Sequence, residues 1–151
     1  MESTRIIAIR HGETTWNVDT RIQGQLDIPL NETGRWQAHR LALALAGEDI
    51  QAIYASDLWR AYDTALSVSK AVDLPVQTHE GLRERGFGDF QGKTFAEIEA
   101  TFPEQALLWR KRDPNFAPAG GESLIQFRER AVNTVHALAA KHPGEQIVVV
   151  A

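Results

Sequence analysis

The sequence has 151 residues, the size of one domain, with a formal net charge of -4 at pH 7 and no cysteine. The absence of cysteine excludes disulfides, thiolate nucleophiles and cysteine-ligated zinc sites. The acidic balance argues against nucleic-acid binding, which normally needs clustered Lys and Arg, and no apolar run approaches the ~20 residues of a membrane helix. We therefore predict one cytoplasmic domain that binds neither nucleic acid nor membrane.

The first part of the chain predicts a strand, a loop and a helix. The apolar run at residues 6–9 predicts a buried strand, and a polar loop without a clear period follows at residues 21–30. Thr33 is expected to cap a helix in which small and apolar residues repeat at helical spacing as far as Ala46. Gly47 is expected to close that helix.

A second strand is predicted at residues 52–55, followed by a helix with Ser56 or Asp57 as its cap. The buried face of this helix is expected to consist of Leu58, Ala61, Tyr62, Ala65 and Val72. Strands that alternate with helices in this way are typical of right-handed βαβ units, which build a parallel sheet.

The middle of the chain predicts a short third strand at residues 74–78, which Pro75 confines to starting there. A glycine-rich loop follows at residues 81–92. Two short helices are expected at residues 95–101 and 104–111.

The last part of the chain predicts a long helix and a final strand. Ser123 and Gln126 have the spacing of a capping box at the start of this helix. Residues 147–150 predict a strand that is buried on both faces. Because a domain seldom ends inside an apolar strand, we expect residues 1–151 to be one domain truncated at its C-terminus.

The run Arg10-His11-Gly12-Glu13-Thr14 follows the first predicted strand, and Asn17 lies three residues further on. Ligands of open α/β sheets bind at this edge, outside the carboxyl ends of the strands. A neutral imidazole can attack phosphorus, and an arginine can hold the phosphoryl oxygens. His11 and Arg10 suit these two tasks, although an isolated Arg-His-Gly is more often an ordinary loop.

Arg60 lies in the first turn of the second predicted helix. Its guanidinium and the free N–H groups of that helix could therefore converge on one anion. The alternative is a surface ion pair with Asp57 or Asp63, which would contribute only about 0.3–0.5 kcal/mol.

Taken together, the run around His11 and the segment from Ser56 to Ala65 that carries Arg60 resemble the histidine phosphatase superfamily, the fold of the cofactor-dependent phosphoglycerate mutases. The resemblance implies a three-layer α/β/α sandwich with a mostly parallel sheet. It also implies that His11 forms a phosphohistidine while Glu84, in Leu82-Arg83-Glu84, protonates the leaving group and later activates water.

The resemblance further implies that the phosphoryl oxygens are held by Arg10, Asn17 and Arg60. Gln23 and Gly24 match a loop of the family that reaches the substrate. No metal or cofactor is required, the substrate is a small phosphorylated metabolite, and a homodimer is left open. In the family a second catalytic His follows the strand that here ends at Ala151, so we expect that residue to come next in the natural chain.

Three functions remain open at this point. The mutases that this chain resembles carry a longer insertion between the acidic glutamate and the Gly-Glu-Ser segment. Here the stretch from Glu84 to Glu122 is compact, which favours a phosphatase over a phosphoglycerate mutase. A non-catalytic phosphate-binding or scaffold protein is the alternative from another class, but such a protein has no use for a proton donor.

Overall fold

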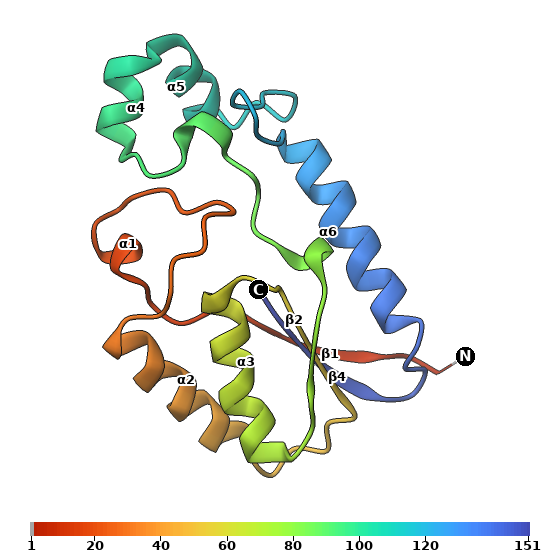
Figure 1. Cartoon of the computed structure of the whole chain (residues 1–151). Coiled ribbons are helices and arrows are strands. Elements are labelled where there is room, and N and C mark those ends of the chain that lie inside the picture. The colour runs from red at the N-terminus through yellow and green to blue at the C-terminus, as the bar shows by residue number, and fades with distance from the viewer. Residues whose placement is uncertain (1) are drawn as a thin grey trace.

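The strands of the computed structural model, which describes residues 2–151, form one parallel sheet (Figure 1). They are β1 (Arg5–Ile9), β2 (Ala52–Ala55), β3 (Val76–Thr78) and β4 (Gln146–Val150). The strand order is β1-β4-β2-β3, so the last strand of the chain lies between the first and the second. This order places the carboxyl ends of β1, β4 and β2 side by side.

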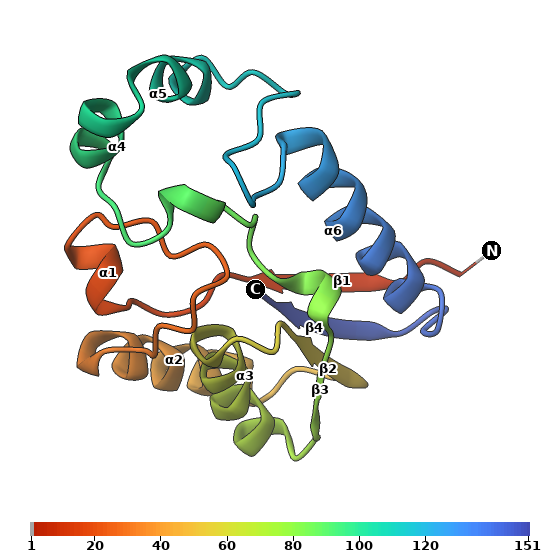
Figure 2. The ribbon, with the colours of Figure 1, turned by 45° about the horizontal axis from the view of Figure 1, so that its top comes forward.

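Helices cover both faces of the sheet, as Figures 1 and 2 show. One face packs against α2 (Glu32–Leu45) and α3 (Trp59–Val72), and the other against α6 (Leu124–Ala139). Because side chains alternate along a strand, β4 contributes to both sides. Val148 and Val150 face the α2–α3 side, whereas Ile147 and Val149 face the α6 side. The expected three-layer α/β/α fold is confirmed.

The first strand differs from its prediction, because β1 is only partly buried. It is the edge strand of this sheet and pairs with β4 alone, and Ala8 is exposed. A short apolar run indicates a strand but does not reveal how many neighbours the strand has. The prediction for β4 is confirmed, since all but its first residue are buried.

Two predicted helix caps are wrong. The N-cap of α2 is Asn31 instead of Thr33, and its side-chain oxygen accepts a hydrogen bond from the Gly34 N–H at 2.8 Å. The N-cap of α3 is Leu58, which has no capping side chain of its own. Instead Asp27, from the polar loop, accepts a 2.7 Å hydrogen bond from the Trp59 N–H at the start of α3.

Most of the segment between β3 and α6 packs separately from the sheet, but Leu82, near its start, belongs to the apolar core between the sheet and α6. After the 3-10 turns η1 (Glu80–Leu82) and η2 (Gly88–Phe90) come α4 (Phe95–Thr101) and α5 (Pro103–Arg110). The sequence indicated both helices but not the 3-10 turns. We call the apolar cluster of this segment the α4–α5 cluster; its fully buried members are Phe90, Ile98 and Ala106.

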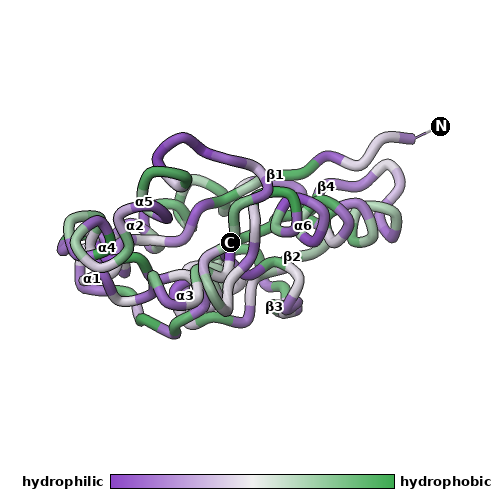
Figure 3. Tube along the Cα trace, turned by 90° about the horizontal axis from the view of Figure 1, so that it is seen from above, coloured by the Kyte–Doolittle hydropathy of each residue, from purple (hydrophilic) through white to green (hydrophobic). Residues whose placement is uncertain are grey.

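The capping box at the start of α6 is confirmed, with Ser123 and Gln126 bonding each other's backbone. Figure 3 shows hydrophobic residues gathered along the strands and hydrophilic residues in many of the surrounding loops. None of the helices within residues 2–151 is long and apolar enough to cross a membrane.

Candidate active site

A cleft of about 460 Å³ opens at the carboxyl edge of the sheet. Its walls come from the ends of β1 and β4, the start of α3, the segment at residues 82–84 and one side of α6. Arg10, His11, Arg60 and Glu84 all line it. The structure therefore brings together four residues, predicted from the sequence, that come from three separate parts of the chain.

His11 is held in this cleft by its own backbone and by its neighbour. Its N–H bonds the Ala151 carbonyl at 2.9 Å, next to β4. The following Gly12 donates its N–H to the Thr64 hydroxyl of α3 at 3.0 Å. A side chain on Gly12 would have no room, because a Cβ there would lie 2.5 Å from the Gly34 carbonyl oxygen of α2.

The imidazole of His11 has a defined tautomer and a lowered pKa. Its Nδ1 lies 2.6 Å from the Gly12 carbonyl oxygen. Since a carbonyl only accepts, Nδ1 carries the hydrogen and Nε2 carries the lone pair. Burial lowers the pKa of His11, the positive charges of Arg60 and Arg10 lower it further, and the bond to Gly12 partly opposes them. His11 therefore presents a neutral nitrogen to the cleft.

Arg60 is a buried and fixed cation. Its residue exposure is 2%, and its guanidinium donates to the Leu26 carbonyl at 2.7 Å and to the Gly24 carbonyl. Burial lowers the pKa of Arg60, but an arginine stays protonated in proteins. None of the ion pairs found among the described residues involves Arg60. The surface-pair alternative is therefore wrong, and the donors that the two carbonyls do not use can serve a ligand.

Asn17 lies in a second hollow, of about 350 Å³, which Arg10 and His11 also line. Its side-chain oxygen accepts hydrogen bonds from the backbone N–H and the hydroxyl of Thr14, at 2.9 and 3.1 Å, in a capping box at the start of α1 (Thr15–Val18). These bonds fix which way the amide nitrogen of Asn17 points. Asn17 is thus close to His11 but does not line the main cleft.

Gln23 and Gly24 also do not line the main cleft. The Gln23 side-chain oxygen accepts a 2.6 Å hydrogen bond from the Thr14 hydroxyl, and the Gly24 carbonyl holds Arg60. Gly24 has a φ of +53°, and a side chain there would collide with Gln91. In this structure both residues support the residues around the site, and their contact with substrate stays a prediction.

Glu84 is exposed at the mouth of the cleft. One of its carboxyl oxygens, Oε1, accepts a 2.6 Å hydrogen bond from the backbone N–H of Arg85. This contact anchors one side of the carboxyl group, and the other oxygen is left for a group in the cleft. The position is suitable for exchanging a proton with a bound ester.

Arg130 of α6 fastens the segment that carries Glu84, and the sequence analysis missed it. Its guanidinium donates to the carbonyls of Gly81 and Arg83, at 2.9 Å each, and to the carbonyl of Glu84 at 3.1 Å. It also forms two hydrogen bonds with the Glu122 carboxylate, at 2.7 and 2.8 Å. One side chain therefore connects α6 to three peptide groups around Glu84.

Glu122 completes this clamp. Besides Arg130, its carboxylate accepts a 2.8 Å hydrogen bond from the Gly86 N–H, and the bonds from Arg130 lower the pKa of Glu122. The Gly-Glu-Ser segment could be explained by the cap at Ser123 alone, so Glu122 was not selected from the sequence. No local pattern indicates Arg130, because all of its carbonyl partners lie more than forty residues away.

A further ion pair closes the same side of the cleft. Arg83 holds Asp57 through two hydrogen bonds of 2.7 Å each, and these bonds lower the pKa of Asp57. Asp57 was expected to cap α3 or to pair with Arg60. It instead joins the Glu84 segment to the residues that precede α3, and this contact adds a cation, Arg83, to the lining of the cleft.

The comparisons with known proteins agree with this geometry. Residues 6–151 match the model of the histidine phosphatase superfamily (branch 1). The chain is 42% identical over 154 residues to phosphoglycerate mutase-like protein 4 of Arabidopsis thaliana, and 43% identical over 143 residues to glucosyl-3-phosphoglycerate phosphatase of Mycobacterium tuberculosis. These alignments cover 99% and 95% of this chain but only 66% and 64% of the two relatives.

A solved structure gives the same result. The mycobacterial glucosyl-3-phosphoglycerate phosphatase in complex with VO3 superposes on this chain with a TM-score of 0.88 at 40% identity. The superposition covers 97% of this chain and 73% of that one.

Proposed function

This chain belongs to the histidine phosphatase superfamily, and we propose that the whole protein hydrolyses a small phosphomonoester through a phosphohistidine on His11. The observation that carries the proposal is the cleft in which His11, three arginines and Glu84 meet. The neutral Nε2 of His11 supports it further, because only an imidazole with a free lone pair can attack phosphorus.

In the first step, Nε2 of His11 forms a bond to phosphorus and the ester P–O bond breaks. Glu84 gives its proton to the departing oxygen, so the leaving group departs as an alcohol. Arg60, Arg10 and Asn17 hold the phosphoryl oxygens. The Arg60 guanidinium is already held by two backbone carbonyls, so it stabilises the charge on these oxygens without rearrangement in the transition state.

In the second step, the Glu84 carboxylate takes a proton from water as the water oxygen attacks phosphorus. The P–Nε2 bond breaks, phosphate leaves, and His11 and Glu84 return to their starting states. The part that a second catalytic His would play in both steps, which the family resemblance implies, stays a prediction.

A phosphatase is favoured over a mutase for two reasons. One of the two relatives and the similar solved structure are phosphatases by name. The segment between Glu84 and Glu122 is also short, and it folds into η2, α4 and α5 with their own apolar cluster. Mutase activity remains the second candidate, because the Arabidopsis relative is called mutase-like.

The test is a panel of phosphomonoesters given to the full-length protein, with release of phosphate and interconversion of phosphoglycerates both measured. We expect phosphate release, an acid-labile phosphate on the protein after rapid quenching, and the loss of both in His11→Ala. His39→Ala is the matched control, because His39 is exposed on α2 and outside the cleft. Interconversion without net release would identify a mutase, and phosphate binding without either reaction would identify a binding protein.

The other predictions about the whole protein belong to the same proposal. The substrate class, a small phosphorylated metabolite, is supported by the name of the mycobacterial relative. A cytoplasmic location and a homodimer remain predictions, as does the lack of nucleic-acid partners.

A further inference from the structure

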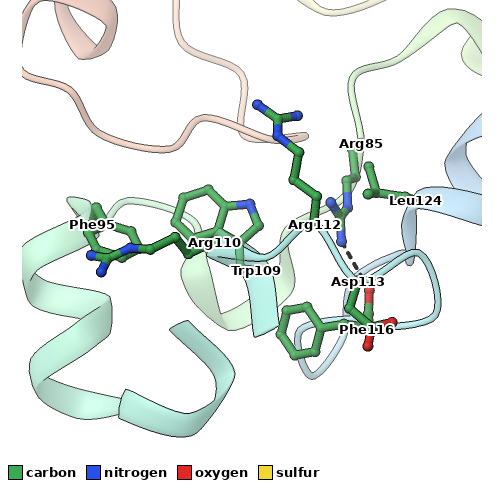
Figure 4. Close-up of a pocket in the computed structure, with 8 residues that line it drawn as sticks. All are labelled: Arg85, Phe95, Trp109, Arg110, Arg112, Asp113, Phe116 and Leu124. Atoms are coloured by element: carbon green, nitrogen blue, oxygen red, sulfur yellow. Dashed lines mark hydrogen bonds between the residues drawn. The ribbon is translucent and has the colours of Figure 1, made fainter. Parts of the chain in front are cut away.

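A separate pocket of about 340 Å³ lies between the α4–α5 pair, the loop after α5 and the start of α6 (Figure 4). Its lining consists of Arg85, Phe95, Trp109, Arg110, Arg112, Asp113, Phe116 and Leu124. Within residues 2–151 this pocket and the cleft have no lining residue in common. The proposed reaction therefore makes no use of the pocket.

The pocket has flat apolar walls. Phe95 and Trp109 pack against each other with ring centroids 5.5 Å apart, and Phe116 and Leu124 form other parts of the lining. All four side chains are only partly buried. Aromatic surfaces of this kind favour a flat ring as ligand, and the volume lies at the small end of the range for ligand sites.

Arg85 brings a positive charge to this apolar surface. It is 4% exposed, and its guanidinium donates to the Glu122 carbonyl at 2.8 Å and to the Phe116 carbonyl at 3.1 Å. These bonds use Nε and Nη2 and leave Nη1. In the described part of the chain, no buried side-chain nitrogen or oxygen lacks a hydrogen-bond partner. Because Nη1 of Arg85 has no such partner, it must be accessible to a ligand or solvent. Arg85 lines this pocket, so we infer that Nη1 is accessible from it.

Arg112 is the second cation that the pocket offers. It follows α5 with a φ of +55°, a conformation that glycine adopts without strain and other residues rarely adopt. Figure 4 shows its guanidinium pointing away from the Asp113 carboxylate. The ion pairs within residues 2–151 include neither Arg112 nor Arg85. This φ belongs to the turn that ends α5, in which the Asp113 N–H bonds the Leu108 carbonyl at 3.1 Å.

The remaining charges of the pocket are already engaged. Arg110 binds Glu99 at 2.9 Å and lies over the Phe95 ring at 4.5 Å. The Asp113 carboxylate accepts a 2.9 Å hydrogen bond from the Asn115 N–H. Three arginines (Arg85, Arg110 and Arg112) thus line the pocket against one lining carboxylate, Asp113, although the whole chain is acidic.

We propose that this pocket binds an aromatic anion, with the ring against Trp109 and Phe116 and the anionic group held by Arg112 and Nη1 of Arg85. The proposal follows from the shape and charge of the pocket and does not depend on the phosphatase reaction. A guanidinium binds a carboxylate through charge-assisted hydrogen bonds, which are stronger than bonds between neutral groups.

The probe is naphthalene-2-carboxylate, titrated into the full-length protein by isothermal calorimetry. Its uncharged analogue, naphthalene-2-carboxamide, tests the need for the anion. We expect the carboxamide to bind at least about tenfold more weakly than the carboxylate. Arg112→Gln should lower the affinity for the carboxylate to a similar extent, which matches the loss of one charge-assisted hydrogen bond. Arg128→Gln, at an exposed position on α6, is the control variant.

Arg112 is exposed and has no protein ion pair to lose, so Arg112→Gln should keep the melting temperature and leave the affinity change interpretable. Binding should also survive saturation with inorganic phosphate and the His11→Ala substitution, because the cleft is a different cavity. The proposal would be overturned if the carboxylate and the carboxamide bound with equal affinity, or if Arg112→Gln bound the carboxylate as tightly as the wild type. Competition by phosphate, or the absence of saturable binding, would overturn it as well.

Discussion

At His11, burial and the charges of Arg60 and Arg10 act in the same direction, because all three disfavour a protonated imidazole. The hydrogen bond to Gly12 acts against them, yet the pKa stays below its ordinary value of 6.5. A group with a lowered pKa keeps its neutral form to lower pH. The proposed nucleophile should therefore be available throughout the neutral range.

This reasoning predicts the acid side of the pH profile. As pH falls through the pKa of His11, the lone pair is lost and kcat/KM should fall, with a midpoint below pH 6.5. Arg10→Gln removes a positive charge beside the ring, so the midpoint should move to higher pH. Steady-state kinetics across pH measure both, with Arg40→Gln, exposed on α2, as control. A midpoint that is unchanged or lower in Arg10→Gln would contradict the assignment.

Arg60 makes the second prediction at the level of single residues. Lys is a point donor and cannot reproduce a guanidinium that binds the Gly24 and Leu26 carbonyls and a phosphoryl group together. Arg60→Lys should therefore lower kcat by roughly 10²–10³, the usual effect of removing one donor to a developing negative charge. The measurement is turnover at saturating substrate, and retention of wild-type kcat would show that Arg60 is structural only.

Among the elements, α6 lines the cleft with its apolar face and acts on the proposed acid through Arg130. The clamp by Arg130 and Glu122 fixes the carbonyls around Glu84, so the acid is positioned by a helix from the other end of the chain. Proton donation matters only when the leaving group is a poor one. Misplacing the acid should therefore affect substrates differently according to their leaving groups.

Arg130→Gln should thus lower kcat for an alkyl phosphate by roughly tenfold or more, with a clearly smaller loss for 4-nitrophenyl phosphate. A general acid contributes roughly 10²–10⁴-fold, and a nitrophenolate leaves without that help. The control is again Arg128→Gln. If both substrates lose the same fraction of activity, Arg130 has only a general structural role.

The helix ends show which contacts the sequence could predict. The box of Ser123 and Gln126 was predictable because both partners lie within one turn. The start of α3 was not, because the acceptor for its first N–H is Asp27, which lies 32 residues earlier in a loop without periodicity. Arg130 is similar, since its role depends on a segment that approaches it only in the folded chain.

For the whole molecule, β4 joins two apolar layers while the α4–α5 cluster stands apart from both. Ile53 belongs to the core between the sheet and the α2–α3 layer, and Ile98 belongs to the α4–α5 cluster; both are fully buried. Separate clusters often open separately. The region that forms the proposed aromatic pocket should therefore be able to loosen without the sheet.

Truncation of each isoleucine tests this separation. Ile53→Ala should lower the free energy of unfolding by about 2–5 kcal/mol and speed amide exchange in β2 and β4. Ile98→Ala should instead speed exchange mainly in α4 and α5 while the sheet stays protected. Native-state hydrogen exchange measures both, and equal acceleration across all elements in Ile98→Ala would show one indivisible core.

Much of the architecture could be predicted from the sequence, but the order of the strands could not. Apolar runs located β1, β2, β3 and β4, and their alternation with helices indicated a parallel sheet. The place of β4 between β1 and β2 is a matter of tertiary packing, which no local pattern records. The same holds for the cleft, since His11, Arg60 and Glu84 could be brought together in advance only through the family resemblance.

The contact between the Gly12 carbonyl and Nδ1 of His11 also predicts the chemical identity of the proposed intermediate. Phosphohistidine has two regioisomers, with the phosphoryl group on the tele nitrogen (Nε2) or on the pros nitrogen (Nδ1). Because the pros nitrogen is occupied by its hydrogen bond, this protein should form the tele isomer alone. Isomer-specific antibodies distinguish the two forms after rapid quenching. Detection of the pros form would mean that the imidazole ring flips before it reacts.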